Sequence, residues 1–298
     1  MIKRCYCCAD EVKNGLYGLH EDCYTKWFLS KKLFENIDPK TSNDSSKRNS
    51  MKKDKNSFYH GKYLKYSARC NGISYILKVQ EDDHPDLPAM EYLCNKIASI
   101  LSLDTAHYYM IDFKNRPTFV TKNFMQDCSG SLHHMYKFLP ENMDYSCAEI
   151  IKIIGNRTKR PRDICRFMER CLFDCLIGNN DRHGRNLGII ETSSGIYLAP
   201  MYDNPSYFGI VSEDLLGADF NISGHIRTKA EKKPKILDYL MEFRKMNYQK
   251  TCNNFIKKTV NRFGLIVEEV KKSYISDKRK KYFLAYLEKR VNEIENEI

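Results

Sequence analysis

The chain has 298 residues, of which 42% are hydrophobic and 29% are charged, so it can form a sizeable core and has an ordinary soluble composition. These values exclude a small disulfide-dependent scaffold, a collagen-like chain and wholesale disorder. The net charge is +11, and residues 228–298 hold 18 Lys and Arg against 10 Asp and Glu. This basic region indicates either a nucleic-acid or acidic-protein partner or a set of solvated helix faces.

No apolar run approaches the roughly 20 residues that cross a bilayer, so we expect no membrane insertion. The first residues, Met-Ile-Lys-Arg-Cys-Tyr-Cys-Cys, lack the pattern of a signal peptide, and we expect a cytoplasmic protein at synthesis. Most of the twelve cysteines are then expected to be reduced, buried apolar residues, because disulfides persist mainly in secreted chains.

The head of the chain has the spacing of a zinc knuckle. Cys5 and Cys8 form a Cys-x2-Cys pair, and after eleven residues His20 and Cys23 form a His-x2-Cys pair, with Cys7 to spare. Two short-spaced pairs provide the four ligands of a structural zinc site and leave no open position for catalysis. Free thiols beside a surface histidine are the alternative. Such a knuckle can dock a protein or bind nucleic acid, so the zinc site alone does not identify the partner. We expect nucleic acid to be at most an indirect partner.

A basic, serine-rich segment follows at residues 37–57. Met51 is the only large apolar side chain of residues 38–57, so ordering this segment is entropically unfavourable and we expect a flexible linker. Its mobility suggests autophosphorylation in cis at one of its serines, although serines are also ordinary linker residues: Ser42, Ser45, Ser46, Ser50 and Ser57.

The next part of the chain, residues 58–126, is predicted to form a small sheet with one helix. Ile73–Val79 alternates apolar and polar residues and is predicted to be a strand. Pro88 opens a segment with apolar residues at helical spacing up to Leu101. Tyr108–Phe113 and Thr118–Phe124 are predicted to form a hairpin.

Helices dominate residues 127–298. Pro161–Ile177 keeps the i, i+3, i+4, i+7 apolar pattern throughout and stops at Gly178, followed by two asparagines. A second small hairpin is predicted from Leu187–Ile190 and Ile196–Leu198, and three or four amphipathic helices are predicted beyond Pro234.

The buried helix leads into a polar loop that carries Asp181 and, five residues later, Asn186, and the hairpin then leads to Asp203. This order suits phosphoryl transfer, in which a carboxylate accepts the proton of the attacking hydroxyl and a carboxamide and a second carboxylate bind Mg²⁺. We assign Asp181 as the base and Asn186 with Asp203 as metal ligands. A simple helix-ending turn with an unrelated loop carboxylate is the alternative. His183 is interpreted as a structural histidine that binds loop backbone.

Phosphoryl transfer also requires a strand lysine for the nucleotide phosphates and a helix carboxylate that pairs with it. Lys78 is the one charge of its strand, and Glu91 borders the apolar face of the next helix. A solvent-facing lysine and an ordinary surface glutamate are the alternatives. Gly61 and Lys62 are candidates for a phosphate-covering turn, although this segment matches neither a Walker A nor a Gly-x-Gly-x-x-Gly pattern.

The segments Asn-Asp-Arg-His-Gly-Arg-Asn ending at Asn186, Ile-Leu-Lys ending at Lys78 and Leu-Ala-Pro-Met-Tyr-Asp ending at Asp203 resemble the HipA-type serine/threonine protein kinases of bacterial toxin-antitoxin systems. The resemblance spans roughly residues 58–250. It implies an α+β, two-lobed protein-kinase-like fold, Mg²⁺- and ATP-dependent phosphorylation of a protein, and autophosphorylation. It also implies that Lys78, Asp181, Asn186 and Asp203 hold ATP, activate the hydroxyl and bind the metal.

The same resemblance implies a helix-turn-helix antitoxin as partner and an aminoacyl-tRNA synthetase as substrate. The cysteine-containing head replaces the additional N-terminal subdomain of the best-known members, so a toxin and a secreted or translocated effector kinase are both open. The alternatives are a catalytically inactive zinc-containing scaffold and a lipid or small-molecule phosphotransferase. The predicted parts are a Cys/His head at residues 1–36, a linker at 37–57, a small mixed β/α lobe at 58–126 and a mainly helical lobe at 127–298.

Overall fold

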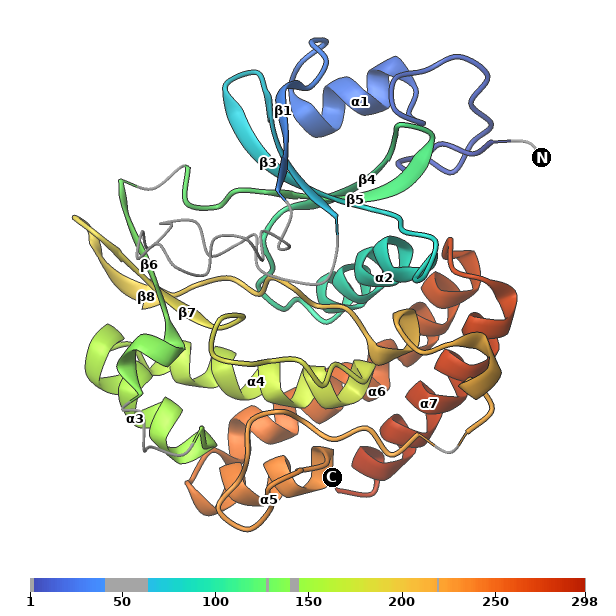
Figure 1. The fold of residues 1–298 in the computed structure, drawn as a ribbon. Coiled ribbons are helices and arrows are strands. Elements are labelled where there is room, and N and C mark those ends of the chain that lie inside the picture. Colours follow the sequence, from blue (N-terminus) through green and yellow to red (C-terminus); the bar gives the residue numbers. More distant parts are fainter. Residues whose placement is uncertain (1–2, 41–63, 127–128, 140–144, 219, 298) are drawn as a thin grey trace, which may run out of the picture.

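An antiparallel sheet and a set of helices form the two lobes of the molecule (Figure 1). The computed structural model describes residues 3–40, 64–126, 129–139, 145–218 and 220–297. Within these ranges no helix is both long and apolar enough to cross a lipid bilayer. The α+β, two-lobed architecture is the one that the sequence predicts.

The N-lobe sheet has five strands in the order β1-β2-β3-β5-β4, and all neighbours are antiparallel. The predicted strand Ile73–Val79 is β3, at the centre of this sheet. Lys114 and Asn115 both have positive φ in the two-residue turn of the β4–β5 hairpin, which matches the twist of the flanking strands. The strands are β1 (Glu35–Lys40), β2 (Lys65–Cys70), β3 (Ile73–Val79), β4 (Tyr108–Phe113) and β5 (Arg116–Lys122).

Helices cover both faces of this sheet. Successive residues of β4 point to opposite faces and belong to different hydrophobic clusters. Met110 packs with α2 (Leu87–Ile100), and Ile111 packs with the N-terminal head. The head contributes α1 (Glu21–Phe28) and the buried Phe34 to the second cluster. The head is therefore the outer layer of the N-lobe.

The predicted boundary between head and linker differs from the structure. Residues 37–40, which the sequence assigns to the linker, complete strand β1 by pairing with β2. The pattern Glu-Asn-Ile-Asp-Pro-Lys is too polar to indicate a strand, and Pro39 is tolerated because β1 is the edge strand of the sheet. The serines of the predicted linker, like Gly61 and Lys62, lie outside the described residues.

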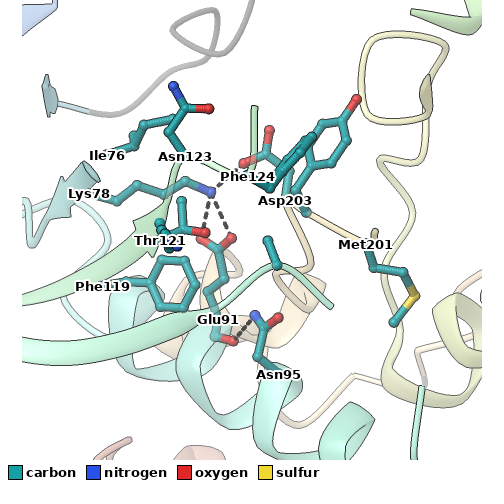
Figure 2. A pocket seen from close by; sticks show the side chains of 13 residues that line it. Ile76, Lys78, Glu91, Asn95, Phe119, Thr121, Asn123, Phe124, Met201 and Asp203 are labelled. Carbon is teal, nitrogen blue, oxygen red and sulfur yellow. Dashed lines mark hydrogen bonds and ion pairs between the residues drawn. The ribbon is translucent and has the colours of Figure 1, made fainter. Parts of the chain in front are cut away.

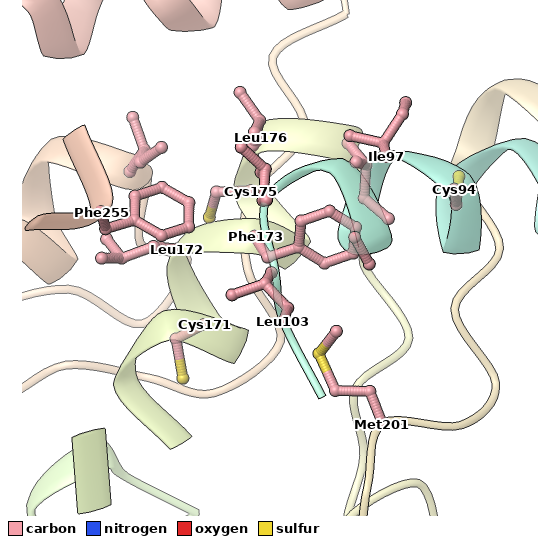
Figure 3. Packing of buried hydrophobic residues seen from close by; sticks show 14 of the residues in the cluster. Cys94, Ile97, Leu103, Cys171, Leu172, Phe173, Cys175, Leu176, Met201 and Phe255 are labelled. Carbon is pink, nitrogen blue, oxygen red and sulfur yellow. The ribbon is translucent and has the colours of Figure 1, made fainter. Parts of the chain in front are cut away.

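The C-lobe is built around α4 (Pro161–Ile177), whose Leu172 and Leu176 belong to the same buried cluster as Ile97 of α2 (Figure 3). This helix has Pro161 in its first turn and ends at Gly178, whose φ of 69° is the left-handed conformation that glycine adopts without strain. The C-lobe also has an antiparallel sheet with the strand order β6-β7-β8. Its strand β6 has no clear sequence signal. The C-lobe elements are β6 (Gly130–His134), β7 (Gly188–Thr192), β8 (Gly195–Leu198), α3 (Cys147–Thr158), α4 (Pro161–Ile177), α5 (Ile236–Lys245), α6 (Gln249–Lys272), α7 (Asp277–Glu295) and the short 3-10 helices Met135–Phe138, Tyr207–Gly209 and Glu213–Leu215.

The lobes are hydrogen-bonded to each other behind the cleft. The amide of Ala106, from the loop between α2 and β4, lies 2.9 Å from the carbonyl oxygen of Met201. The amide of Met201 in turn lies 2.9 Å from the carbonyl oxygen of Asp104. These bonds fix the N-lobe to the segment that leads to Asp203.

Candidate active site

A buried ion pair joins β3 to α2. The Nζ atom of Lys78 lies 2.6 and 2.8 Å from the two carboxylate oxygens of Glu91 (Figure 2). Lys78 is 8% exposed and Glu91 is 2% exposed. Two buried charges are tolerated because each satisfies the other, so the pair fixes the position of α2 relative to the sheet.

Asp203 reaches the same ammonium group from the C-lobe and forms an ion pair with Lys78. Its φ is 51°, a left-handed conformation that is uncommon for non-glycine residues and that aspartate tolerates better than most. Burial alone raises the pKa of Asp203, but the charges of Lys78 and Lys65 outweigh this effect and hold the pKa well below its ordinary value. The carboxylate of Asp203 is therefore ionised at neutral pH.

Lys65 is a second buried lysine at this place, and no sequence motif indicates it. It stands on β2 directly opposite Lys78 in the antiparallel register and is 2% exposed. Burial lowers the pKa of Lys65, and the carboxylate of Asp203 partly opposes this shift. Lys65 does not itself line the cleft, but its charge adds to that of Lys78, which does, and positive charge there suits a polyanionic ligand such as a chain of phosphates.

The loop after α4 contains the two other predicted residues. The amide of Asp181 donates to Oδ1 of Asn179 at 3.0 Å, and Nδ2 of Asn186 donates to the carbonyl oxygen of Asp181 at 3.0 Å. The loop is thus closed on itself, and the amide nitrogen of Asn186 is used, which leaves the amide oxygen as the group that can ligate a cation. The Asp181 side chain is 62% exposed, so a substrate group can reach it.

His183 contacts loop backbone. Its Nδ1 accepts a hydrogen bond from the amide of Arg185 at 3.2 Å, in agreement with the interpretation of a structural histidine. Its Nε2 lies 3.8 Å from Oδ1 of Asp181, which is too far for a hydrogen bond. At this distance, His183 cannot exchange a proton directly with Asp181.

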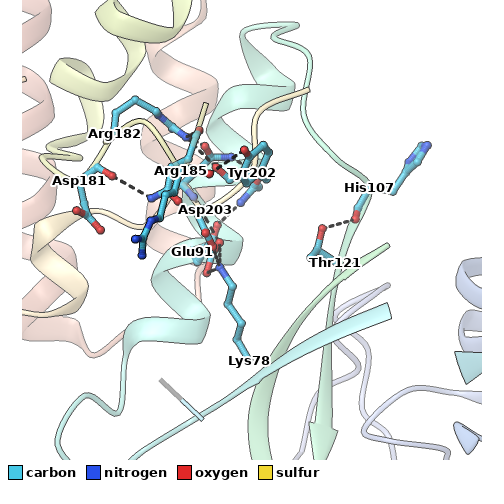
Figure 4. Close-up of polar contacts among 12 residues, drawn as sticks. Lys78, Glu91, His107, Thr121, Asp181, Arg182, Arg185, Tyr202 and Asp203 are labelled. Carbon is cyan, nitrogen blue, oxygen red and sulfur yellow. Dashed lines mark hydrogen bonds and ion pairs between the residues drawn. The ribbon is translucent and has the colours of Figure 1, made fainter. Parts of the chain in front are cut away.

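Arg182 fixes the position of the loop through buried hydrogen bonds, a role that the sequence analysis did not predict. Its side chain is 1% exposed, and its Nε and Nη2 each lie 2.8 Å from a carboxylate oxygen of Asp174 on α4. Its Nη1 donates to the carbonyl oxygens of Tyr202 at 2.7 Å and of Asn186 at 3.2 Å. One guanidinium therefore ties α4, the loop and the residue before Asp203 together (Figure 4).

The network continues to the Lys78 pair. Nη2 of Arg182 donates to Oδ1 of Asn204 at 2.6 Å. Nδ2 of Asn204 donates to Oδ1 of Asn95 at 3.0 Å, and the Asn204 amide lies 3.4 Å from Oε1 of Glu91. A continuous polar chain thus links the loop of Asp181 to Glu91 and Lys78. The one sequence signal for it is Asp174, a carboxylate placed between the apolar residues Phe173 and Cys175 near the end of α4.

A cleft lies between the lobes beside this network. Its charged end is formed by Lys78, Glu91 and Asp203, and the rest of its lining is largely apolar (Figure 2). The chemistry of this lining, apolar over most of its extent and charged at one end, matches a ligand with a flat apolar ring and an anionic tail. The apolar part includes Ile76, Ala106, Phe119, Phe124, Met201 and Tyr202.

The head brings together its four predicted ligands. The ligand atoms of Cys5, Cys8, His20 and Cys23 all lie within 4.8 Å of one another. This group belongs to the outer layer of the N-lobe and shares no residue with the cleft.

Comparisons with known proteins agree with this arrangement. Residues 39–276 match the model of the HipA-like C-terminal domain. The chain is 23% identical over 148 residues to Y4mE of Sinorhizobium fredii (strain NBRC 101917 / NGR234), which is named as a candidate kinase. That match covers 44% of this chain and 35% of Y4mE, so it spans about a third of the relative's length.

Two solved structures share the fold. The Helicobacter pylori proinflammatory kinase CtkA has a TM-score of 0.64 at 19% identity, over 78% of this chain and 91% of that one. The structure of the Shewanella oneidensis MR-1 toxin-antitoxin system, HipA with HipB and operator DNA, matches with a TM-score of 0.55 at 15% identity, over 80% of this chain and 62% of that one. The family model covers most of the sequence, and this chain therefore belongs to the HipA-like kinase family.

Proposed function

We propose that this chain is an ATP- and Mg²⁺-dependent kinase that phosphorylates a serine or threonine hydroxyl of a protein. The observation that supports this most strongly is the meeting of Glu91 and Asp203, from different lobes, on the ammonium group of Lys78. A structural ion pair would need one carboxylate. Two carboxylates around one lysine, at the end of an interlobe cleft, suit a site in which phosphates and a cation take over part of these contacts.

The binding of ATP follows from the division of the cleft. The nucleobase occupies the apolar part, Lys78 binds the phosphates, and the buried Lys65 on the neighbouring strand adds positive charge beside them. Glu91 keeps Lys78 aligned, because it contacts the ammonium group with both oxygens.

The donor set fits Mg²⁺. Asp203 offers a carboxylate held ionised and Asn186 an amide oxygen, and hard oxygen ligands of this kind are the ones Mg²⁺ prefers. Asp203 and Asn186 would hold Mg²⁺, which would supply charge neutralisation for the transferred phosphoryl group. The zinc predicted for the head has no part in this chemistry, because four protein ligands leave no open position.

Asp181 is the general base in this proposal. Its exposed carboxylate accepts the proton of the incoming hydroxyl while the hydroxyl oxygen bonds to the γ-phosphorus. The bond between that phosphorus and the oxygen bridging to the β-phosphate breaks, and the products are a phosphoprotein and ADP. Arg182 positions the loop that carries Asp181 through its bonds to Asp174 and Asn186.

The test is transfer of radiolabel from [γ-³²P]ATP to protein in a bacterial lysate, with and without Mg²⁺. We expect labelled protein bands with the wild-type chain, and a loss of about 100-fold or more with Asp181→Asn. Asp277→Asn is the control, because it makes the same chemical change at a side chain that is 96% exposed on α7.

The alternatives give different results. A lipid or small-molecule phosphotransferase consumes ATP in the lysate but labels no protein, and an inactive scaffold consumes none beyond the Asp181→Asn background. Either result contradicts the proposal.

Substrate and partner are proposed from the resemblance to the family. We propose an aminoacyl-tRNA synthetase as a substrate and an antitoxin as a partner, since the Shewanella HipA was solved together with HipB. Incubation with a panel of purified synthetases, followed by phosphopeptide mapping, tests the substrate. The same mapping tests autophosphorylation at the serines of residues 42–57.

A further inference from the structure

The four ligands of the head come from two separate elements. Cys5 and Cys8 lie in a tight turn, in which the amide of Ala9 donates to the carbonyl oxygen of Cys5 at 2.9 Å and Ala9 has a φ of 67°. His20 and Cys23 come from the start of α1. Because each pair arrives on its own backbone segment, a metal bound to all four would connect the turn to the helix.

The orientation of His20 is that of a metal ligand. Its Nδ1 lies 3.3 Å from Sγ of Cys8, and its Nε2 lies 2.9 Å from the carbonyl oxygen of Glu11. A donated Nε2–H leaves Nδ1 unprotonated and directed at the three sulfurs, which is the outer-shell arrangement that metal-binding histidines have. Three cysteine sulfurs and one imidazole nitrogen this close together form a ligand set that favours four-coordinate Zn²⁺.

The cysteine turn is anchored to two elements of the N-lobe by Tyr6, which lies between the first two ligands. The Tyr6 hydroxyl donates to Oδ1 of Asp112 on β4 at 2.8 Å, and Lys3 forms an ion pair with the same carboxylate. The carbonyl oxygen of Tyr6 lies 3.5 Å from the hydroxyl of Tyr92 on α2. Tyr92 directly follows Glu91, the partner of Lys78.

The same turn also contacts the C-lobe. Tyr274, between α6 and α7, has its ring centroid 4.7 Å from that of Tyr6 in an edge-to-face arrangement. Its hydroxyl lies 3.4 Å from the carbonyl oxygen of Cys5. Tyr6 accordingly packs against the hydrophobic clusters of both lobes.

We propose that Cys5, Cys8, His20 and Cys23 bind one Zn²⁺, and that this zinc makes the cysteine turn a clasp that holds α2 between the N-lobe sheet and the C-lobe. Loss of the metal frees the turn, and α2 then loses the contacts around Tyr92. Since α2 carries Glu91, zinc occupancy controls the alignment of Lys78, and in this respect the inference rests on the proposed kinase function.

The first measurement is the zinc content of the purified full-length chain by mass spectrometry. We expect one zinc per chain in the wild type and in Cys7→Ser, which changes a cysteine of the same turn that is not in the ligand group. The double variant Cys8→Ser/Cys23→Ser should contain none. Absence of zinc from the wild type, or its retention in the double variant, overturns the proposal.

The second measurement is amide hydrogen exchange in residues 87–100, before and after zinc is removed from the wild type with a chelator. We expect exchange there to become about tenfold faster without zinc, and to slow again when Zn²⁺ is added back. Tyr274→Ala, which keeps all four ligands, should retain its zinc and yet exchange faster in the same helix.

These readouts separate the clasp from the catalysis. Exchange in α2 that does not respond to zinc removal overturns the clasp, whatever the enzymatic activity. If zinc binds and protects α2 but no form of the chain transfers phosphate, the proposed kinase function fails and the clasp stands.

Discussion

Asp203 is a residue whose backbone and charge are both unusual. Its left-handed φ turns the chain sharply after Tyr202, and its carboxylate lies against Lys78. Asparagine and aspartate tolerate this conformation better than alanine, for which it costs roughly 1–2 kcal/mol. The conformational requirement and the charge requirement at this position can therefore be separated by substitution.

We expect Asp203→Asn to reduce phosphate transfer by about 100-fold or more, because the proposed mechanism requires a charged carboxylate at this position to bind Mg²⁺. We expect Asp203→Ala to lose as much activity and, in addition, about 1 kcal/mol of folding free energy relative to Asp203→Asn, because alanine is strained at this φ. Urea unfolding of the two variants measures the difference. Equal stabilities would contradict the conformational part of the prediction.

The lowered pKa of Asp203 predicts a pH dependence of stability. Between its folded and unfolded pKa values the folded state binds fewer protons, so the ionised carboxylate stabilises the fold above the ordinary aspartate pKa of about 4, and this contribution is lost as the pH falls further. The difference in unfolding free energy between wild type and Asp203→Asn should be constant from about pH 8 to 5 and shrink below about pH 4. A difference that persists unchanged to pH 3 would refute the assignment.

At the scale of elements, α4 and the loop that follows it form one unit. The helix supplies Asp174, and the loop returns Arg182 to it, so the end of the helix and the start of the polar loop share a buried ion pair. Arg182 uses all three of its nitrogens in this position. The exposed Asp181 therefore stands on a rigid base.

Arg182→Lys keeps the charge but cannot reproduce the planar set of bonds. We expect it to lower the free energy of unfolding by about 3 kcal/mol, because Asp174 and the carbonyl oxygen of Tyr202 lose buried donors. Arg185→Lys, the same change at an exposed residue of the same loop, should alter stability by less than about 0.5 kcal/mol. Similar losses in both variants, measured by urea unfolding, would rule out the special role of Arg182.

Local sequence patterns predicted the elements with strong periodicity. The limits of α4 and β3 agree with the prediction, because each has a regular apolar pattern and α4 also has a proline and a glycine at its ends. Strand β6, Gly-Ser-Leu-His-His, lacks such a pattern, since it is short and only partly buried. β1 was missed for the same reason.

Much of the candidate site was predicted because its chemistry requires particular residue types in a fixed order. The expected contact of Lys78 with Glu91 is present, and Asp203 joins them. Arg182 and Lys65 were missed, because their burial depends on neighbours that are remote in the sequence. Polar residues of this kind look like ordinary surface charges until the fold brings their partners to them.

At the scale of the whole molecule, the head is an integral layer of the N-lobe. Aromatic side chains of the head and of the sheet meet in one cluster, in which the ring of Phe28 lies 4.8 Å from that of Tyr109 and 5.5 Å from that of Tyr75. The family model begins at residue 39, so this layer lies outside it.

Truncating the centre of that cluster should destabilise the full chain. Phe28 is completely buried, and we expect Phe28→Ala to cost about 4 kcal/mol of unfolding free energy, through lost burial and the cavity that remains. Leu29→Ala, at a neighbouring side chain that is 74% exposed, should change stability by less than about 0.5 kcal/mol. Thermal unfolding measures both, and a mild effect of Phe28→Ala would show that the head is a dispensable appendage.

The backbone bonds between Asp104, Ala106 and Met201 determine how the two lobes can move. Because Met201, two residues before Asp203, is hydrogen-bonded to Asp104 and Ala106 of the N-lobe, the lobes cannot separate there without breaking main-chain hydrogen bonds. Any relative motion of the lobes that keeps these two hydrogen bonds is therefore a rotation about the segment of Asp104, Ala106 and Met201. Asp203 lies two residues after Met201, so it stays close to the axis of such a rotation and moves less than residues at the opposite edge of the cleft.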